Sequence, residues 1–251
     1  MEIQSFPSLP STNTYIAENA ASLPSGFVAV TPCQTAGRGQ RGNSWESEPG
    51  KNLTFTMLMR MPGFPARRQF RISQAVSLAI IDAIRELTGV SCTVKWPNDI
   101  YARDRKLCGI LISHSLAGSA IAHSVIGAGI NVNQTRFLSD APNPVSISQL
   151  TDREHPLEPL LRLVCSNIES YLNTLLPDNP AQEQDIHDRY MRSLWRAGDT
   201  PHLFHDNLLD QTFRATIFAV EPQGHLVLRQ TDAPEGRAPL RRYAFKEVTW
   251  L

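Results

Sequence analysis

The chain has no excess of charge of either sign. Lys and Arg number 24, Asp and Glu also number 24, and the formal net charge is zero. A non-specific nucleic-acid binder needs a basic surface, so this balance predicts no nucleic-acid partner. Long apolar runs are also missing, because no segment approaches the roughly 18 uninterrupted apolar residues of a transmembrane helix. We therefore expect no membrane contact.

Targeting and cysteine signals are scarce as well. Met1–Ser5 lacks the basic start and apolar core of a signal peptide. The four cysteines, at positions 33, 92, 108 and 165, are far apart and form no CxxC pair. This spacing argues against a disulfide framework or a zinc site. Together these absences predict a cytoplasmic protein in a reducing environment.

What the chain does have is enough apolar sequence for a packed core, at 41% hydrophobic and 19% charged residues. Apolar residues at 72, 75, 76, 79, 80, 83, 84 and 87 repeat with helical spacing. They predict a helix over 70–87 that Gly89 ends. Residues 52–61 alternate and predict a strand with one strongly apolar face. Further strands are predicted at 27–30, 91–96, 108–112 and 124–132, and further helices at 14–21, 157–176 and 182–194.

The sequence pattern changes after Gly198. Apolar residues alternate with polar ones over 213–219, Pro222-Gln223-Gly224 marks a turn, and short strand-like runs follow. This pattern predicts a small all-β module of about 50 residues. We expect a large domain over 1–197 and the β module over 198–251.

One loop is unusually rich in glycine and arginine. Residues 37–45 read Gly-Arg-Gly-Gln-Arg-Gly-Asn-Ser-Trp. Glycine permits unusual backbone angles and close approach to a ligand, and the arginine fork suits phosphate or carboxylate. The loop predicts an anion-binding flap that orders over a ligand. A solvated surface loop is the alternative.

A second group of polar residues ends a predicted strand, at Lys95-Trp96-Pro97-Asn98-Asp99. Ligands commonly lie at strand ends in α/β sheets. Lys95 could meet a phosphate or a carboxylate, and Asp99 could accept from an N–H group or hold Mg²⁺ through oxygen. The alternative is a structural turn, formed by Asn98 and Asp99, with a surface ion pair.

Glycines recur next to polar residues on two later strands. Lys106 precedes an apolar run that contains Gly109, and Gly127 and Gly129 precede Asn131. Gly109 beside Lys106 suggests a ligand that lies on the sheet with its anion near the lysine. The alternatives are a solvated edge lysine and, for Gly127 and Gly129, a bulge or tight sheet packing.

Ser11-Thr12-Asn13 stands just before the predicted helix at 14–21. Ser and Thr are good N-caps, so the simplest interpretation is capping. A polar clamp for a ligand at the unpaired helix N-terminus is the alternative.

The order of these motifs resembles the biotin protein ligase family. The series runs from Ser-Thr-Asn through Gln-x-x-Gly-Arg-Gly-x-x-Gly-x-x-Trp, Lys-Trp-Pro-Asn-Asp and Lys-Leu-x-Gly-Ile-Leu to Gly-x-Gly-Ile-Asn, over residues 11–133. The resemblance implies an α+β fold: a central mixed sheet with flanking helices, as in class II synthetases, followed by an SH3-like β-barrel. It also implies a ligase without the repressor domain that some family members carry.

The activity implied by the resemblance has two steps. Biotin and ATP, with Mg²⁺ and no prosthetic group, form biotinyl-5′-AMP, and the biotinyl group then passes to a lysine of a carboxylase's biotin carboxyl carrier domain. A homodimer is compatible with the sequence. The alternatives are a lipoate or octanoate ligase or transferase of the same fold, and a non-catalytic biotin-binding module.

The resemblance also implies residue roles. Lys106 and Arg38 are the expected catalytic residues, and Asp99 is the candidate Mg²⁺ ligand. Gln40 and Asn43 stand where arginine is common in the family, which bears on retention of the adenylate. Biotin is expected to contact Ser11, Thr12, Asn13, Gln34, Gly37, Arg38, Gly39, Gln40, Lys106 and Gly109. ATP is expected to contact Arg38, Arg41, Trp45, Lys95, Asn98, Asp99 and Asn131.

Overall fold

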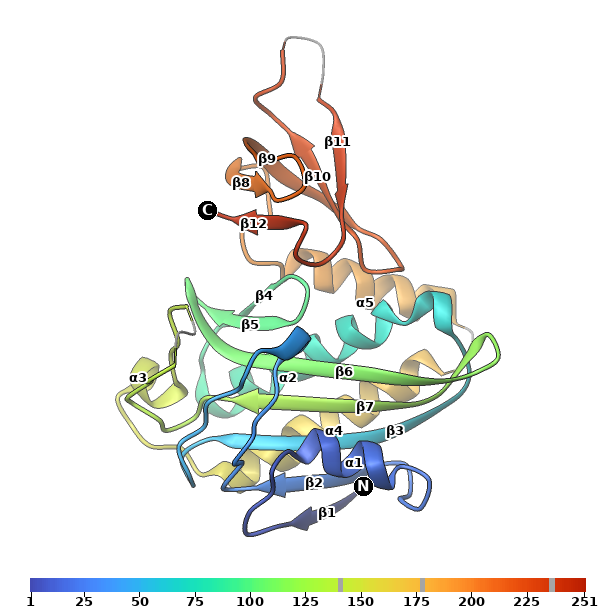
Figure 1. The fold of residues 1–251 in the computed structure, drawn as a ribbon, viewed down its shortest axis with the longest axis vertical. Helices are drawn as coiled ribbons and strands as arrows, with labels where there is room; N and C mark the ends of the chain where they lie inside the picture. Colours follow the sequence, from blue (N-terminus) through green and yellow to red (C-terminus); the bar gives the residue numbers. More distant parts are fainter. Residues whose placement is uncertain (140–141, 177–178, 235–237) are drawn as a thin grey trace.

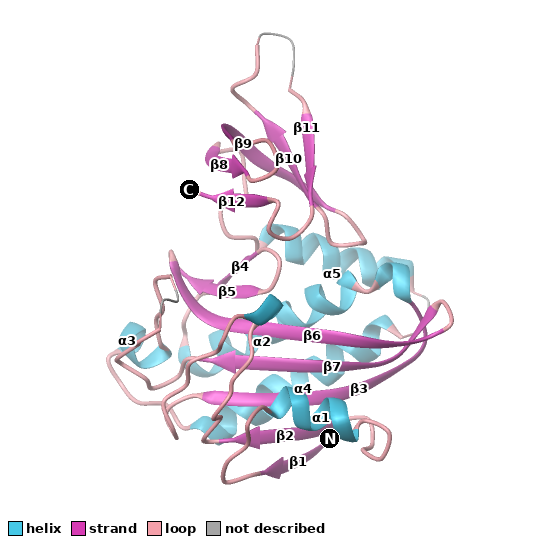
Figure 2. Cartoon of the chain, in the orientation of Figure 1, coloured by secondary structure: helices cyan, strands magenta, loops and turns pink. Residues whose placement is uncertain are grey.

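Two β-sheets organise the chain in a computed structural model that describes residues 1–139, 142–176, 179–234 and 238–251, apart from the side chain of Arg41 (Figures 1 and 2). The larger sheet has seven strands in the order β1-β2-β3-β7-β6-β5-β4. β1 and β2 are parallel and all other neighbours are antiparallel, so the mixed sheet predicted from the resemblance is confirmed. Its strands are β1 (Glu2–Ser5), β2 (Phe27–Thr31), β3 (Leu53–Pro65), β4 (Thr93–Lys95), β5 (Asp99–Ala102), β6 (Arg105–Ala117) and β7 (Ala120–Ile130).

Helices cover both faces of this sheet. α2 (Phe70–Thr88), α4 (Leu157–Leu175) and α5 (Pro180–Arg192) lie on one face, and α1 (Thr12–Asn19) lies on the other (Figure 1). The apolar stripe of α2 is buried from Ile72 to Ile84, as its spacing predicts, whereas Leu87 in the last turn is exposed. Gly89 ends α2 in the left-handed conformation, with φ of 74°, and its N–H bonds to the carbonyl of Arg85. Shorter helical segments are α3 (Ile147–Thr151), η1 (Gln40–Gly42) and η2 (Ala66–Arg68).

The first seven residues of β3 are buried on both faces of the strand, whereas the sequence predicted only one strongly apolar face. Leu53, Phe55 and Met57 belong to the main core, with α2 and α4. Thr54 and Thr56 point the other way and are buried as well. These two threonines form part of the floor of the cleft described below.

The C-terminal part of the chain forms a second, five-stranded antiparallel sheet in the order β11-β10-β9-β8-β12. It is a small all-β module, as predicted. Its contacts with the rest of the chain include a hydrogen bond and an aromatic pair. The Trp96 indole N–H donates to the carbonyl of Gly224 at 2.9 Å, and the ring centroids of Trp195 and Trp250 are 5.3 Å apart. Its strands are β8 (His202–Asp206), β9 (Gln211–Val220), β10 (Leu226–Gln230), β11 (Leu240–Tyr243) and β12 (Val248–Trp250).

Two strands of the larger sheet differ from expectation. β1 is not predicted, because its four residues are mostly exposed and carry no clear alternation. Asp99 is predicted to lie in a turn, but it begins β5 and pairs with Lys95 of β4 in a short hairpin. Among the described residues, no helix is both long and apolar enough to cross a membrane.

Candidate functional site

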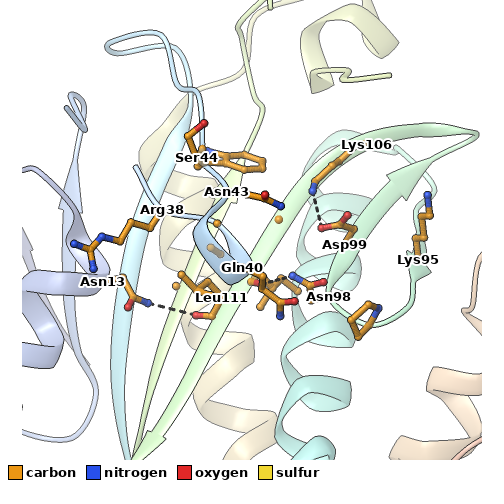
Figure 3. Close-up of a pocket in the computed structure, with 18 of the residues that line it drawn as sticks. Asn13, Arg38, Gln40, Asn43, Ser44, Lys95, Asn98, Asp99, Lys106 and Leu111 are labelled. Atoms are coloured by element: carbon orange, nitrogen blue, oxygen red, sulfur yellow. Dashed lines mark hydrogen bonds and ion pairs between the residues drawn. The ribbon is translucent and has the colours of Figure 1, made fainter. Parts of the chain in front are cut away.

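A cleft of about 1040 Å³ lies on the face of the larger sheet that carries α1, and it extends to the C-terminal sheet (Figure 3). Its floor comes from β3, β6 and β7. Its walls come from the start of α1, the Gly37–Trp45 flap (residues 37–45), the β4–β5 hairpin and residues 245–250. The cleft therefore gathers most of the motifs singled out in the sequence.

One end of the cleft is polar. The hydroxyl of Ser11 accepts the N–H of Thr14 and caps α1, so the capping interpretation is confirmed. Thr12 has a different role. Its N–H and its hydroxyl both donate to Gln34 Oε1, at 3.0 and 3.2 Å, and its hydroxyl lies 2.9 Å from that of Thr56. Donors and acceptors thus converge at the position where a polar clamp was the alternative to capping.

Asn13 extends this polar end across the sheet. Its Nδ2 donates to the carbonyl of Leu111 on β6 at 3.4 Å (Figure 3). Gly127 makes room for this contact, because a Cβ at that position would lie 2.9 Å from Asn13 Nδ2 and 3.3 Å from the Leu111 oxygen. A larger residue at 127 would therefore push the amide away from the sheet.

The Gly37–Trp45 flap folds back on itself. Trp45 N–H donates to the Gly37 carbonyl at 3.0 Å, and Gly39 N–H donates to the Asn43 carbonyl at 2.7 Å. A Cβ at Gly37 would lie 2.4 Å from the Trp45 carbonyl oxygen, so the fold of the flap requires glycine there.

The indole of Trp45 lies directly against two paired glycines. Gly109 of β6 and Gly129 of β7 are register partners. A Cβ at Gly129 would lie 2.3 Å from Trp45 Nε1, and one at Gly109 would lie 2.8 Å from Trp45 Cζ3. Of the two structures considered for Gly129, bulge or tight packing, the second is therefore confirmed. The indole N–H is buried against Gly129, with no hydrogen-bond partner among the described residues.

The other end of the cleft is cationic. Lys106 Nζ lies 2.8 Å from Asp99 Oδ1 (Figure 3) and 5.7 Å from the ring centroid of Trp45. Lys95 Nζ donates to the Tyr101 hydroxyl at 3.1 Å and lies 5.0 Å from the centroid of Trp195. Burial lowers the pKa of Lys95 below its ordinary value. Asp99 does form an ion pair, but its partner is Lys106 of β6 rather than a residue of the 95–99 motif, and both residues line the cleft.

The predicted amide ligands are held by backbone groups. Asn98 Nδ2 donates to the carbonyl of Ile110 at 2.7 Å, and Asn98 still lines the cleft. Asn131 is only 3% exposed and lies next to the cleft lining rather than in it. Its Nδ2 donates to the carbonyl of Val145 at 3.1 Å, and its Oδ1 is buried without a partner among the described residues. Contact of Asn131 with a nucleotide stays a prediction.

The flap residues differ in their exposure and in whether their side chains are described. Arg38 is exposed at the cleft and has no carboxylate partner among the described residues. Gln40 lines the cleft, and its Oε1 is buried without a partner in the described part of the chain. The backbone of Arg41 lies in η1, but its side chain is outside the described structure. Gly39 and Asn43 also line the cleft.

The donor set suits a magnesium ion only in part. Asp99 is the one carboxylate among the described residues that line the cleft. No group of three His, Cys, Asp or Glu residues in the described structure could hold a metal ion. Mg²⁺ is usually bound by one or two carboxylates together with substrate phosphates, so Asp99 fits an ion that arrives with a nucleotide.

Several lining residues were not identified from the sequence. Thr54 and Thr56 lie on β3, for which only the apolar face was interpreted. Their alternation with apolar residues was the pattern that could have placed them on the opposite face. The contributions of the C-terminal sheet and of the segment after β7 carry no local motif. These further residues are Ser139, Pro142, Asn207, Phe245, Lys246, Val248, Thr249 and Trp250.

A comparison with family models matches residues 5–131 to the biotin/lipoate A/B protein ligase family. The chain belongs to this family. The match covers the predicted motif series almost completely, so the resemblance inferred from motif order is confirmed. In this biotin/lipoate ligase family member, the polar and cationic ends of the cleft come from the matched region. The C-terminal sheet contributes from outside it.

Individual relatives agree with this assignment. The chain is 39% identical over 137 residues to the bifunctional ligase/repressor BirA of Salmonella typhimurium, which covers 55% of this chain and 42% of that protein. It is 32% identical over 188 residues to the biotin--[acetyl-CoA-carboxylase] ligase of Mycobacterium tuberculosis, covering 71% and 67%. The fold matches the biotin protein ligase from Aquifex aeolicus in complex with biotin and ATP. The TM-score is 0.78 at 19% identity, over 99% of this chain and 97% of that one.

Proposed function

We propose that this chain is an ATP-dependent ligase that activates biotin as biotinyl-5′-AMP and transfers it to a lysine of a biotin carboxyl carrier domain. The observation that carries the proposal is a single cleft with a polar end, an aromatic and glycine middle, and a cationic end. The substrates named for the relatives, biotin and acetyl-CoA carboxylase, agree with it.

The polar end favours biotin over a simple fatty acyl chain. Thr12, Gln34 and Thr56 form a buried or half-buried set of donors and acceptors there. The ureido group of biotin offers both N–H and C=O groups to such a set. The apolar end of an octanoyl chain would pack against these groups without offering any of them a hydrogen bond, so nothing would offset the cost of removing their water.

The cationic end suits adenylation. The biotin carboxylate attacks the α-phosphorus of ATP, the bond to the β-phosphate bridging oxygen breaks, and pyrophosphate leaves. The protein must hold two anions together and neutralise them, and no side-chain nucleophile is needed. Lys106 can bridge the carboxylate and the α-phosphate, and Arg38 and Lys95 can offset charge on the triphosphate. Mg²⁺ bound to the nucleotide would assist departure of pyrophosphate, with Asp99 as its protein ligand.

Transfer then requires an amine in place of water. The neutral ε-amino group of the acceptor lysine attacks the acyl carbon, AMP leaves with the bonding electron pair, and the amine loses a proton to solvent. Water at the same carbon would destroy the intermediate. The Gly37–Trp45 flap, with its indole packed against Gly109 and Gly129, can exclude water from the adenylate.

The test is a parallel labelling assay. The purified chain is incubated with ATP, Mg²⁺ and an apo carrier domain, and with biotin, lipoate or octanoate in separate reactions. We expect label on the carrier lysine with biotin only, and none when that lysine is replaced by arginine. Labelling with lipoate or octanoate instead would reassign the substrate. Adenylate formation without transfer would limit the proposal to its first step.

A further inference from the structure

The residue that follows the flap makes an unusual set of contacts. Glu46 comes directly after Trp45, and its carboxylate accepts backbone N–H groups from a loop far along the chain. Leu138 N–H donates to both oxygens, at 2.9 and 3.0 Å, and Ser139 N–H donates to Oε2 at 2.7 Å. One side chain therefore holds two consecutive N–H groups of a segment 92 and 93 residues away.

A buried amide supports the same connection. Gln134 is 1% exposed, and its Nε2 donates to Glu46 Oε1 at 3.0 Å. Its Oε1 accepts from Glu48 N–H at 2.9 Å and from Asn52 Nδ2. The loop of residues 134–139 is thus tied to both the exit of the flap and the start of β3.

The end of this loop near Leu138 is not held by apolar packing. The side chain of Leu138 is 91% exposed even though its N–H is bonded to Glu46. Ser139 lines the cleft. Further along the chain, the carbonyl of Asn143 accepts Lys106 N–H at 2.8 Å, and Val145 N–H donates to the Lys106 carbonyl at 2.9 Å. Among the described residues, the Glu46 carboxylate is therefore the hydrogen-bond partner of the end of this loop, between the flap and the strand of Lys106.

We propose that Glu46 is a positioning residue that fastens the Gly37–Trp45 flap to the 134–139 loop, so that the two segments close over the acyl-adenylate as one unit. This inference rests on the proposed function, since it assigns Glu46 to retention of the intermediate between the two steps. Burial raises the pKa of Glu46, but the N–H groups of Leu138 and Ser139 outweigh it and the pKa falls below its ordinary value. The group is therefore ionised at neutral pH.

The main test measures how long the adenylate stays bound. The enzyme is loaded with biotin and α-labelled ATP, treated with pyrophosphatase and diluted, and label released to solution is followed with time. Glu46→Ala should release adenylate about tenfold faster or more, which corresponds to one net hydrogen bond to a charged group. Glu46→Gln, which keeps one acceptor oxygen, should lie between this variant and the wild type.

Glu48→Ala is the matched control. Glu48 is exposed, lies two residues further along, and its carboxylate accepts no hydrogen bond from the described residues. It should release adenylate at the wild-type rate. A wild-type release rate in Glu46→Ala, or an equal acceleration in Glu48→Ala, would overturn the proposal.

A second readout does not depend on activity. Arg38 in the flap and Arg136 in the loop are sites for limited cleavage by trypsin. Glu46→Ala should accelerate cleavage at both sites together, at an unchanged unfolding temperature, because the two segments open as one. Acceleration at only one site would contradict joint closure. If Glu46→Ala does not fold, Glu46→Gln decides by the same cleavage assay. If the wild type makes no adenylate, the proposed function fails while the cleavage result still decides the attachment.

Discussion

Gly129→Ala is the most direct test of how the flap closes. The added Cβ would lie 2.3 Å from Cε2 and from Nε1 of Trp45. Ordinary contacts between such atoms are about 3.5–4.0 Å, so the indole would have to move by about 1.2–1.7 Å. The same ring also packs directly on the backbone of Gly109, so it cannot tilt deeper toward the sheet. The ring must leave its position.

The cost follows from the surface that the ring gives up. Exposing a large apolar side chain costs about 1.5–3 kcal/mol, which lowers the population of the closed flap roughly 10- to 100-fold. The backbone of Gly129 is extended, without a positive φ, so alanine itself strains nothing in β7. We expect the dissociation constant for biotin to rise roughly 10- to 100-fold by titration calorimetry. The unfolding temperature should fall by about 3–12 °C, because 1 kcal/mol shifts it by about 2–4 °C in a chain of this size.

The double variant Trp45→Ala/Gly129→Ala separates the indole from every other effect of the new methyl group. In the Trp45→Ala background, Gly129→Ala should change biotin affinity less than about twofold, because no ring remains to clash. If the two substitutions have additive effects, or if Gly129→Ala alone binds biotin like the wild type, the packing argument is refuted.

Three further outcomes are expected. Lys106→Ala should abolish biotin-dependent ATP–pyrophosphate exchange, at a cost of roughly 10²–10³ in rate or more. Circular dichroism should show an intact fold, because the Lys106–Asp99 pair borders the open cleft and not the apolar core. Arg38→Ala should weaken adenylate binding more than about tenfold in a calorimetric titration, and an unchanged affinity would remove it from the phosphate site. Asp206→Asn should lower the unfolding temperature at neutral pH, because the buried carboxylate accepts N–H groups from Leu208 and Leu209 and the hydroxyl of Tyr243. Burial raises the pKa of Asp206, but these hydrogen bonds outweigh burial and lower the pKa below 3.8. The stabilisation by the carboxylate is therefore present above pH 3.8 and is lost as the pH falls through the folded-state pKa. Below that pKa, the difference in stability between Asp206→Asn and the wild type should vanish.

The elements that the sequence predicted well are those with a long repeating pattern. The stripe of α2 and its stop at Gly89 are both present, and the alternation of β3 is present over a longer strand. β1 and β5 have four residues each, too few for a period to be recognised. Asp99 follows Pro97 and Asn98, which are strong turn residues, so the turn pattern concealed the start of β5.

Many of the residues that line the cleft were predictable as a group, but their contacts were not. Motif order identified Lys106, Arg38 and the polar residues near Ser11, yet the pairing of Gly109 with Gly129 depends on the register of β6 and β7. Register is set by the whole hairpin and its turn, which no local motif specifies. Trp45 was expected to contact ATP, within a loop predicted to order over a ligand. Its packing on this glycine pair supports ordering of the loop.

The charge of the cleft differs from the net charge of the chain, so composition alone does not predict it. The whole chain is neutral, and this balance argued against an extended basic surface for nucleic acid. Among the described residues that line the cleft, however, Arg38, Lys95, Lys106 and Lys246 face one carboxylate, Asp99, a local formal charge of +3 from four cations minus one anion. A concave site lined by one sign of charge focuses its field on a small anion. The net charge of the chain therefore predicts whether a large polyanion such as nucleic acid binds. Attraction of a triphosphate depends instead on a few cations that folding brings together from β4, β6, the flap and the C-terminal sheet.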